Sequence, residues 1–255
     1  IDGPSESQWF DDAYFWKAEE YYLLGKPEKA VSSYREFLSR FPESELRDQV
    51  YYNMAWAELK LGRFEDAIIN FKKTVDTSED ENLVASSYCR IGDIYMDKLD
   101  YKTAQEYYDR VLKGYPENYY ADYAQFQLAA SFLKMNSPEA AAISFQSLIL
   151  NYPRSNMLDK ALFELGMVYF QQGKYELAAE QFKNLIEDCY NSTLLDKALY
   201  QLGSCSFNIG AYDKAEVIFK SLIQKGEDPR LTEISIYHLG RNYYQKGERQ
   251  KSLKI

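Results

Sequence analysis

The sequence has little of what an active site or a metal centre needs. Its 255 residues include one histidine, His238, and three cysteines, Cys89, Cys189 and Cys205. The cysteines are scattered and lack the spacing of metal ligands or of a disulfide framework, and a single histidine offers no paired acid and base. We find no nucleophile elbow, phosphate-binding loop, dinucleotide-binding glycine pattern or zinc-protease motif. The sequence therefore predicts a protein that is not an enzyme and that holds no cofactor and no metal.

The sequence also lacks an excess of positive charge. Lysine and arginine number 30 against 39 aspartate and glutamate residues, which gives a net charge of −9. Binding to a phosphate backbone depends on clustered lysine and arginine. We therefore expect no nucleic acid partner.

Long apolar runs are absent as well. No stretch approaches the roughly 20 apolar residues of a membrane-spanning helix, so we expect no transmembrane segment in this chain, and a membrane tether would lie outside it. No signal peptide is visible at Ile1; an exported protein would be present here in a mature or trimmed form. The few cysteines fit either the cytoplasm or a bacterial periplasm and do not decide between them.

What the sequence does contain is a regular repeat. A hinge position follows each expected first helix, and successive hinges stand 37 residues apart (62 − 25 = 37). A period of this size is the signature of a solenoid, in which two-helix units stack on their neighbours along the chain. The hinge positions are Gly25, Gly62, Leu99, Asn136, Gly173, Gly210 and Gly247.

Three further positions keep the same step. An alanine follows each of the first six hinges by five residues, at Ala30, Ala67, Ala104, Ala141, Ala178 and Ala215, and Ser252 follows the seventh. An aromatic residue comes four positions later, at Tyr34, Phe71, Tyr108, Phe145, Phe182 and Phe219. A small residue precedes each hinge, at Ala18, Ala55, Gly92, Ala129, Gly166, Gly203 and Gly240. We interpret the hinges as left-handed helix ends and the small residues as sites of close helix approach.

The repeat divides the chain into units. Residues 1–10 are expected to be a turn-rich lead-in, and 11–255 a single solenoid of helix pairs. Each unit is counted from the start of its first helix, and the seventh stops partway through its second helix. The expected units are 11–47, 48–84, 85–121, 122–158, 159–195, 196–232 and a partial seventh at 233–255.

These residues resemble the tetratricopeptide repeat. The pattern is clearest at Leu165-Gly166, Tyr169, the Gly173 hinge, and Ala178 followed by Phe182. Links such as Tyr152-Pro153-Arg154-Ser155 are similar to those of a longer bacterial cell-envelope variant, found in outer-membrane assembly lipoproteins and in Tol-Pal-associated repeat proteins. The resemblance implies an all-α fold, an α-α superhelix of antiparallel helix pairs, and a non-catalytic scaffold that binds a protein or peptide partner.

In the family, three rows of first-helix residues line a concave groove. Carried over, the first row is Phe15, Tyr52, Cys89, Phe126, Phe163, Tyr200 and Tyr237. The second row is Tyr22, Leu59, Met96, Leu133, Phe170, Phe207 and Tyr244. The third row is Glu19, Trp56, Asp93, Ala130, Met167, Ser204 and Arg241. From these rows we predict a partner-binding set of Tyr52, Trp56, Phe126, Phe163, Met167, Tyr200, Tyr237 and Arg241. The alternative is that these side chains pack adjacent units together.

Three functions stay open at this stage. The first is an interaction scaffold of the bacterial cell envelope or periplasm, the second a small-molecule or lipid binder with an apolar pocket, and the third a cytoplasmic adaptor. The final segment, Lys251–Ile255, is too short to cover the seventh first helix. We expect either more sequence in the natural chain or self-association through this unfinished repeat.

Overall fold

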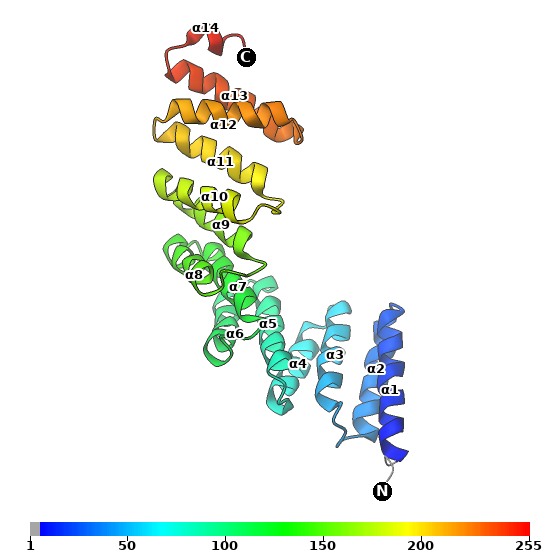
Figure 1. Cartoon of the computed structure of the whole chain (residues 1–255). Coiled ribbons are helices and arrows are strands. Elements are labelled where there is room, and N and C mark those ends of the chain that lie inside the picture. Colours follow the sequence, from blue (N-terminus) through cyan, green and yellow to red (C-terminus); the bar gives the residue numbers. More distant parts are fainter. Residues whose placement is uncertain (1–5) are drawn as a thin grey trace. The chain divides into compact units, whose positions relative to one another are not determined.

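The protein folds as a succession of α-helices (Figure 1). The computed structural model describes residues 6–255, with side chains from Phe10 onward, and this part contains helices and no strand. The expected all-α fold is confirmed. Of the lead-in expected at 1–10, residues 1–5 lie outside the described part, whereas residues 6–10 are already helical. No glycine or proline follows Pro4 until Gly25, so nothing there interrupts a helix.

First helices and second helices alternate along the chain. The first helices are α1 (Glu6–Leu23), α3 (Arg47–Lys60), α5 (Glu81–Asp97), α7 (Ala121–Lys134), α9 (Leu158–Gln171), α11 (Leu195–Asn208) and α13 (Pro229–Gln245). The second helices are α2 (Pro27–Arg40), α4 (Phe64–Thr77), α6 (Tyr101–Gly114), α8 (Pro138–Asn151), α10 (Tyr175–Asp188), α12 (Tyr212–Lys225) and α14 (Arg249–Ser252). Each second helix begins 37 residues after the previous one (64 − 27 = 37).

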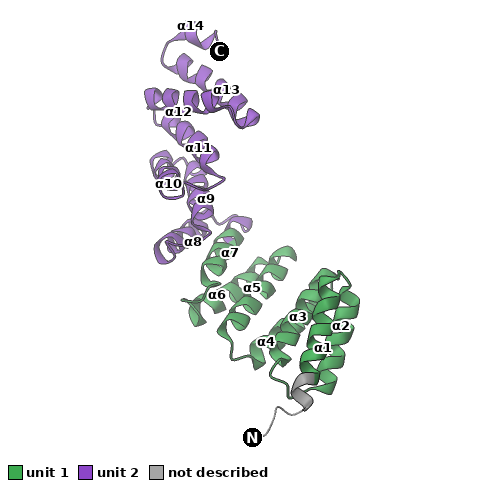
Figure 2. Ribbon diagram, turned by 45° about the vertical axis from the view of Figure 1, so that its right-hand side comes forward, with its two compact units in different colours: residues 1–131 green, residues 132–255 purple. Residues whose placement is uncertain are grey.

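The chain divides into two compact units, residues 1–131 and 132–255 (Figure 2). Within the first unit, α3 packs against α4 of its own pair and also against α1 and α5. Within the second, each helix from α8 to α14 packs against the next, and α11 also contacts α13. In each unit, neighbouring first helices therefore lie side by side. The single solenoid over 11–255 stays a prediction.

Two first helices begin earlier than the repeat predicts. Units were expected to start at 85 and 233, but α5 begins at Glu81 and α13 at Pro229. Asp80 accepts a hydrogen bond from the Asn82 backbone N–H at 2.8 Å, and Asp228 accepts one from Arg230 at 2.9 Å. Each aspartate is therefore an N-cap that satisfies a free amide and extends the helix by about one turn.

The links between repeats are hydrogen-bonded to the preceding first helix. The hydroxyl of Ser44 donates to Asp11 at 2.6 Å, and that of Ser192 donates to Asp159 at 2.5 Å. Each serine also accepts a hydrogen bond from a backbone amide two residues later. The serine of the link therefore fixes the turn and joins it to the start of its own repeat.

Every hinge position adopts the left-handed conformation. The backbone φ is +69° at Gly25 and +72° at Gly173, and it stays positive at Leu99 (+62°) and Asn136 (+54°), where the repeat has no glycine. The fixed step in sequence thus reproduces a fixed backbone geometry, as expected. Leucine pays a steric cost in this conformation that glycine avoids.

This cost predicts a stabilising substitution. Leu99→Gly is expected to raise the free energy of unfolding by about 0.5–1 kcal/mol, because Leu99 is 70% exposed and contributes strain without much burial. Urea unfolding followed by circular dichroism measures the change. Leu99→Ala is the control: alanine removes the same side chain and keeps the left-handed strain, so it should give no comparable gain.

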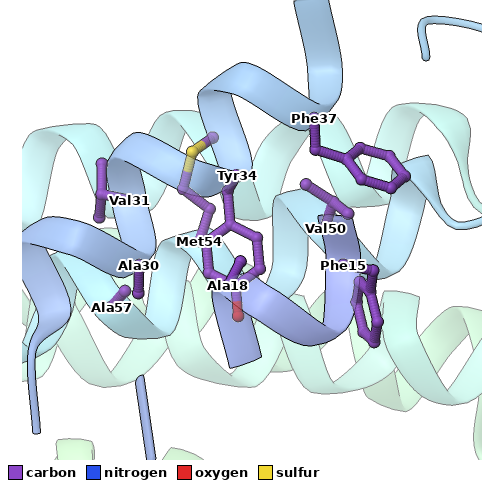
Figure 3. Close-up of a cluster of buried hydrophobic side chains, with 9 residues drawn as sticks. All are labelled: Phe15, Ala18, Ala30, Val31, Tyr34, Phe37, Val50, Met54 and Ala57. Carbon is purple, nitrogen blue, oxygen red and sulfur yellow. The ribbon is translucent and has the colours of Figure 1, made fainter. Parts of the chain in front are cut away.

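The hydrophobic core has the same period as the sequence. The six aromatic residues of the repeat and the alanines four positions before them are fully buried. Figure 3 shows the first copy, where Tyr34 of α2 lies beside Ala18 of α1 and Met54 of α3. The small residue on each first helix allows this approach. A Cβ on Gly166 would lie 2.7 Å from Cε1 of Phe182, closer than van der Waals contact permits.

Candidate partner-binding face

The predicted partner-binding residues differ in exposure. Six of them are half-buried, namely Tyr52, Trp56, Phe126, Phe163, Met167 and Tyr200. Only Tyr237, which is 61% exposed, and Arg241 stand largely in solvent. Partner binding by these eight residues stays a prediction. The exposed fraction of each side chain limits the area that it can offer to a partner.

The half-buried rings are half-buried because they pack on the aromatic residue of their own repeat. The ring centroids of Tyr52 and Phe71 are 5.6 Å apart, as are those of Phe163 and Phe182. Such edge-to-face pairs hold each ring in one orientation. Two other members of the first row, Phe15 and Cys89, are buried and offer no surface to a partner. The packing interpretation therefore applies to part of the first row.

In the first unit, Arg90 on α5 lies at the centre of a group of residues from first helices α3, α5 and α7 and second helix α6. Its guanidinium lies 5.6 Å from the ring of Trp56 on α3 and 4.9 Å from that of Tyr123 on α7. Its Nη1 lies 2.7 Å from Oδ2 of Asp93. Asp93 also accepts hydrogen bonds from the hydroxyls of Tyr108 at 2.8 Å and Tyr123 at 2.9 Å. We call Trp56, Arg90, Asp93, Tyr108 and Tyr123 the Arg90 cluster.

The Arg90 cluster is largely buried: the side chain of Arg90 is 21% exposed and that of Asp93 is 23% exposed. Burial raises the pKa of Asp93 above its ordinary value, against the opposing effect of Arg90 and the two tyrosine hydroxyls. Burial and the nearby Asp93 charge raise the pKa of Tyr123 to about 12, so its hydroxyl stays protonated at neutral pH. The cluster thus holds a cation between two aromatic rings.

The sequence reasoning did not single out Arg90 and Tyr123. Arg90 stands one position after the first row, where later repeats also carry polar residues: Gln127, Glu164, Gln201 and His238. A polar residue at that position in repeat after repeat was a readable signal. It was overlooked because the three family rows do not include that position.

In the second unit, an open groove of about 570 Å³ lies along α13. Its walls carry Tyr237, Arg241 and Tyr244, and Ile236 and Ile255 contribute apolar surface. The guanidinium of Arg241 lies 5.1 Å from the ring of Phe207 and 5.8 Å from that of Tyr237. Ser252 of α14 also lines the groove, and its hydroxyl donates to the carbonyl oxygen of Gly240 on α13 at 2.9 Å.

His238 packs against Tyr237 of this groove. Its ring lies 5.6 Å from that of Tyr200 and 5.3 Å from that of Tyr237. Burial lowers the pKa of His238 below its ordinary value, and the charge of Arg241 lowers it further. The imidazole is therefore neutral at pH 7 and acts as a packing group between the two tyrosines.

Below the groove, an ion-pair network joins α12 to the end of α13. Glu216 accepts hydrogen bonds from Lys220 at 2.8 Å, Tyr243 at 3.2 Å and Lys246 at 2.7 Å. Hydrogen bonds from Lys220 and Lys246 lower the pKa of Glu216 to about 2, from an ordinary 4.5. A carboxyl group with a lowered pKa stabilises the fold above its ordinary pKa and loses that effect as the pH falls towards the lowered value.

The lowered pKa of Glu216 predicts that its contribution to stability depends on pH. Glu216→Gln should lower the free energy of unfolding by about 1–2 kcal/mol at pH 7, where solvent at the edge of the network screens part of the interaction. The difference from the natural chain should shrink as the pH falls from 4.5 to about 2. Urea unfolding at several pH values measures it, with Glu180→Gln at an exposed position of α10 as control. An unchanged difference at low pH would contradict the assignment.

The described residues contain no group of three or more histidine, cysteine, aspartate or glutamate side chains placed to hold a metal ion. None of the helices in residues 6–255 is both long and apolar enough to cross a membrane. Cys89 and Cys205 are buried thiols, and burial raises the pKa of each to about 12.

Comparison with protein families matches separate parts of the chain to three families. Residues 12–44 and 197–225 match one tetratricopeptide repeat family, and residues 48–80 match another. Residues 81–193 match the YfiO family, described as outer membrane lipoprotein. No curated protein matches the chain.

Solved structures agree on the fold. The C-terminal part of a tetratricopeptide repeat protein from Cytophaga hutchinsonii is 16% identical, with a TM-score of 0.70, over 88% of this chain and 86% of that one. A tetratricopeptide repeat protein from Parabacteroides merdae is 14% identical, with a TM-score of 0.60, over 95% and 89%. YrrB, described as a TPR protein with an unusual peptide-binding site, is 20% identical, with a TM-score of 0.57, over 79% and 96%. Residues 12–44, 48–80 and 197–225 thus match tetratricopeptide repeat families, and the chain shares the fold of these solved tetratricopeptide repeat proteins.

Proposed function

We propose that this chain is a non-catalytic scaffold of the bacterial cell envelope that binds an extended or helical segment of a partner protein along its first helices. The single observation that carries the proposal is the α13 groove, in which exposed Tyr237 and Tyr244 flank Arg241. Tyrosine and arginine are the residue types that most often dominate binding energy at interfaces. The tyrosine rings bury large areas at a small cost in side-chain entropy.

The Arg90 cluster provides a second contact region of similar chemistry. Trp56 is half-buried and already oriented by Phe71 and Arg90, so a partner need not pay to order it. Affinity would come from such fixed aromatic anchors, and specificity from the few charges beside them. The two regions lie in different units, and each is proposed as a contact region in its own right.

The cell-envelope location is supported by the match of residues 81–193 to an outer membrane lipoprotein family. The link Tyr152-Pro153-Arg154-Ser155, within that match, is of the kind expected for the envelope variant. Binding of a peptide is supported by the likeness in fold to YrrB, whose own peptide-binding site is described as unusual.

A selected peptide tests the proposal. A random peptide library displayed on phage is selected on the immobilised natural chain, and the recovered peptides are titrated by isothermal calorimetry. The triple variant Trp56→Ala, Met167→Ala, Arg241→Ala should weaken binding about 100-fold, the sum expected from two or three anchors. Circular dichroism confirms that the variant is folded.

Two further variants keep the result interpretable. Tyr237→Ala with Arg241→Ala changes only exposed residues, so its effect cannot be a loss of folding. The control Ile69→Ala, Leu177→Ala, Lys183→Ala changes exposed residues of second helices α4 and α10 and should leave binding unchanged. Peptides that bind all three variants as tightly as the natural chain would contradict the proposal.

A further inference from the structure

One second helix differs from all the others in charge. Helices α2, α4, α6, α10 and α12 carry five charged residues each, whereas α8 carries only Glu139. Charged residues normally occupy the solvent side of a helix that packs by one face. The solvent side of α8 therefore lacks the charged side chains that keep the other second helices from associating with apolar surfaces.

Two large apolar side chains occupy that side. Ile143 is 65% exposed and Leu150 is 80% exposed, and their spacing of seven residues places them on one face. Half-buried Ala140 and Ser147 complete a stripe with the 3-4-3 spacing of a helix-pairing seam. By contrast, Val217, which stands at the same repeat position in α12 as Ile143 in α8, is isolated among charged neighbours.

The polar residues beside the stripe already have hydrogen-bond partners. The hydroxyl of Ser147 donates to the carbonyl oxygen of Ile143 at 3.0 Å. The side-chain amide of Gln146 donates to the hydroxyl of Tyr169 at 2.7 Å. Covering the stripe therefore leaves neither of these donors without an acceptor, so the usual penalty for burying polar groups is small here.

The order of small and large residues shows what fits the stripe. In an antiparallel pair of identical α8 helices centred on Phe145, Leu150 of one copy faces Ala140 of the other, and Ile143 faces Ser147. Each large side chain thus meets a small one, which is the condition for close helix packing. A parallel pair would set Leu150 against Leu150 and Ala140 against Ala140 and leave a gap.

We propose that the outer face of α8 is a self-association surface that pairs with α8 of a second copy in antiparallel orientation. The face is self-complementary in shape, and its one charged residue, Glu139, faces Asn151 of the other copy in this pairing, so no like charges meet across the two-fold axis. One helix pair buries less surface than a standard interface, so the dimer should be weak. This inference does not depend on the proposed binding function.

Sedimentation velocity tests the dimer. The natural chain should shift from monomer to dimer across roughly 10 μM to 1 mM, the range of small transient interfaces. Ile143→Glu with Leu150→Glu should remain monomeric throughout, because pairing would bury two carboxylates of each copy against Ser147 and Ala140 of the other without a cation. Val217→Glu is the matched control, since Val217 is 68% exposed, and it should dimerise like the natural chain.

Cysteine cross-linking tests the orientation, in a Cys189→Ser background. Ala140→Cys and Leu150→Cys lie ten residues apart on one helix, about 15 Å, too far for a disulfide within a chain. The antiparallel pair predicts a covalent dimer from the double variant and none from either single variant. Monomer at every concentration, dimerisation that survives the double glutamate variant, or cross-linking by either single cysteine variant would overturn the proposal.

Discussion

Replacing Phe182 with alanine is expected to lower the free energy of unfolding by about 3–5 kcal/mol, the usual cost of removing a fully buried aromatic ring. Phe182 on α10 has no exposed surface, and its ring contacts that of Phe163. It also fills the space against Gly166, where no side chain from α9 can replace it. The first and second helices of that repeat would lose their main contact. Urea unfolding followed by circular dichroism measures the loss.

A control on the same helix separates this effect from helix propensity. Leu177 also lies on α10 but is exposed, so Leu177→Ala should change the free energy of unfolding by less than about 1 kcal/mol. Hydrogen exchange should also show that the loss in Phe182→Ala is concentrated in α9 to α11, because each repeat contacts only its neighbours. Equal losses in the two variants would contradict the assigned core.

The second large effect comes from adding a single methyl group. Gly166→Ala should lower the free energy of unfolding by about 1–3 kcal/mol, the usual cost of overfilling a packed core. The new Cβ would stand 2.7 Å from Cε1 of Phe182, a fully buried ring, so the ring or the helix must shift. This loss exceeds the gain of about 0.5–1 kcal/mol that alanine normally brings to a helix interior.

Gly240→Ala provides the matched control at the same repeat position. There α14 is short, and the nearest atoms to an added Cβ are Cγ2 of Ile255 at 3.9 Å and the Ser252 carbonyl oxygen at 4.0 Å. Only the helix-propensity gain remains, so this variant should be neutral or slightly stabilised. If Gly166→Ala and Gly240→Ala behaved alike, the close approach of helix to ring would not be what the small residue provides.

The backbone of the repeat could be predicted from the sequence because each hinge needs one residue with positive φ at a fixed position. The step of 37 residues placed Leu99 and Asn136 at the hinge even though neither is glycine, and both have positive φ. The starts of α5 and α13 could not be predicted in this way. They depend on the caps Asp80 and Asp228, which occur in only two repeats and so leave no periodic signal.

The candidate binding face was harder to predict, because a row of aromatic residues at helical spacing does not show which neighbours cover it. Tyr52 and Phe163 are partly covered by the aromatic residues of their own repeats, whereas Tyr237 is 61% exposed. The Arg90 cluster combines residues from three first helices and from α6, and it depends on how those helices lie beside one another. Sequence periodicity alone cannot give such a contact.

The central claim is that a partner binds along the first helices. Hydrogen–deuterium exchange of the natural chain, with and without a peptide selected from the phage library, tests it most directly. The account predicts added protection in first helices, above all α13, with second helices α2, α4, α6, α8, α10 and α12 unchanged. Added protection confined to those second helices would contradict it.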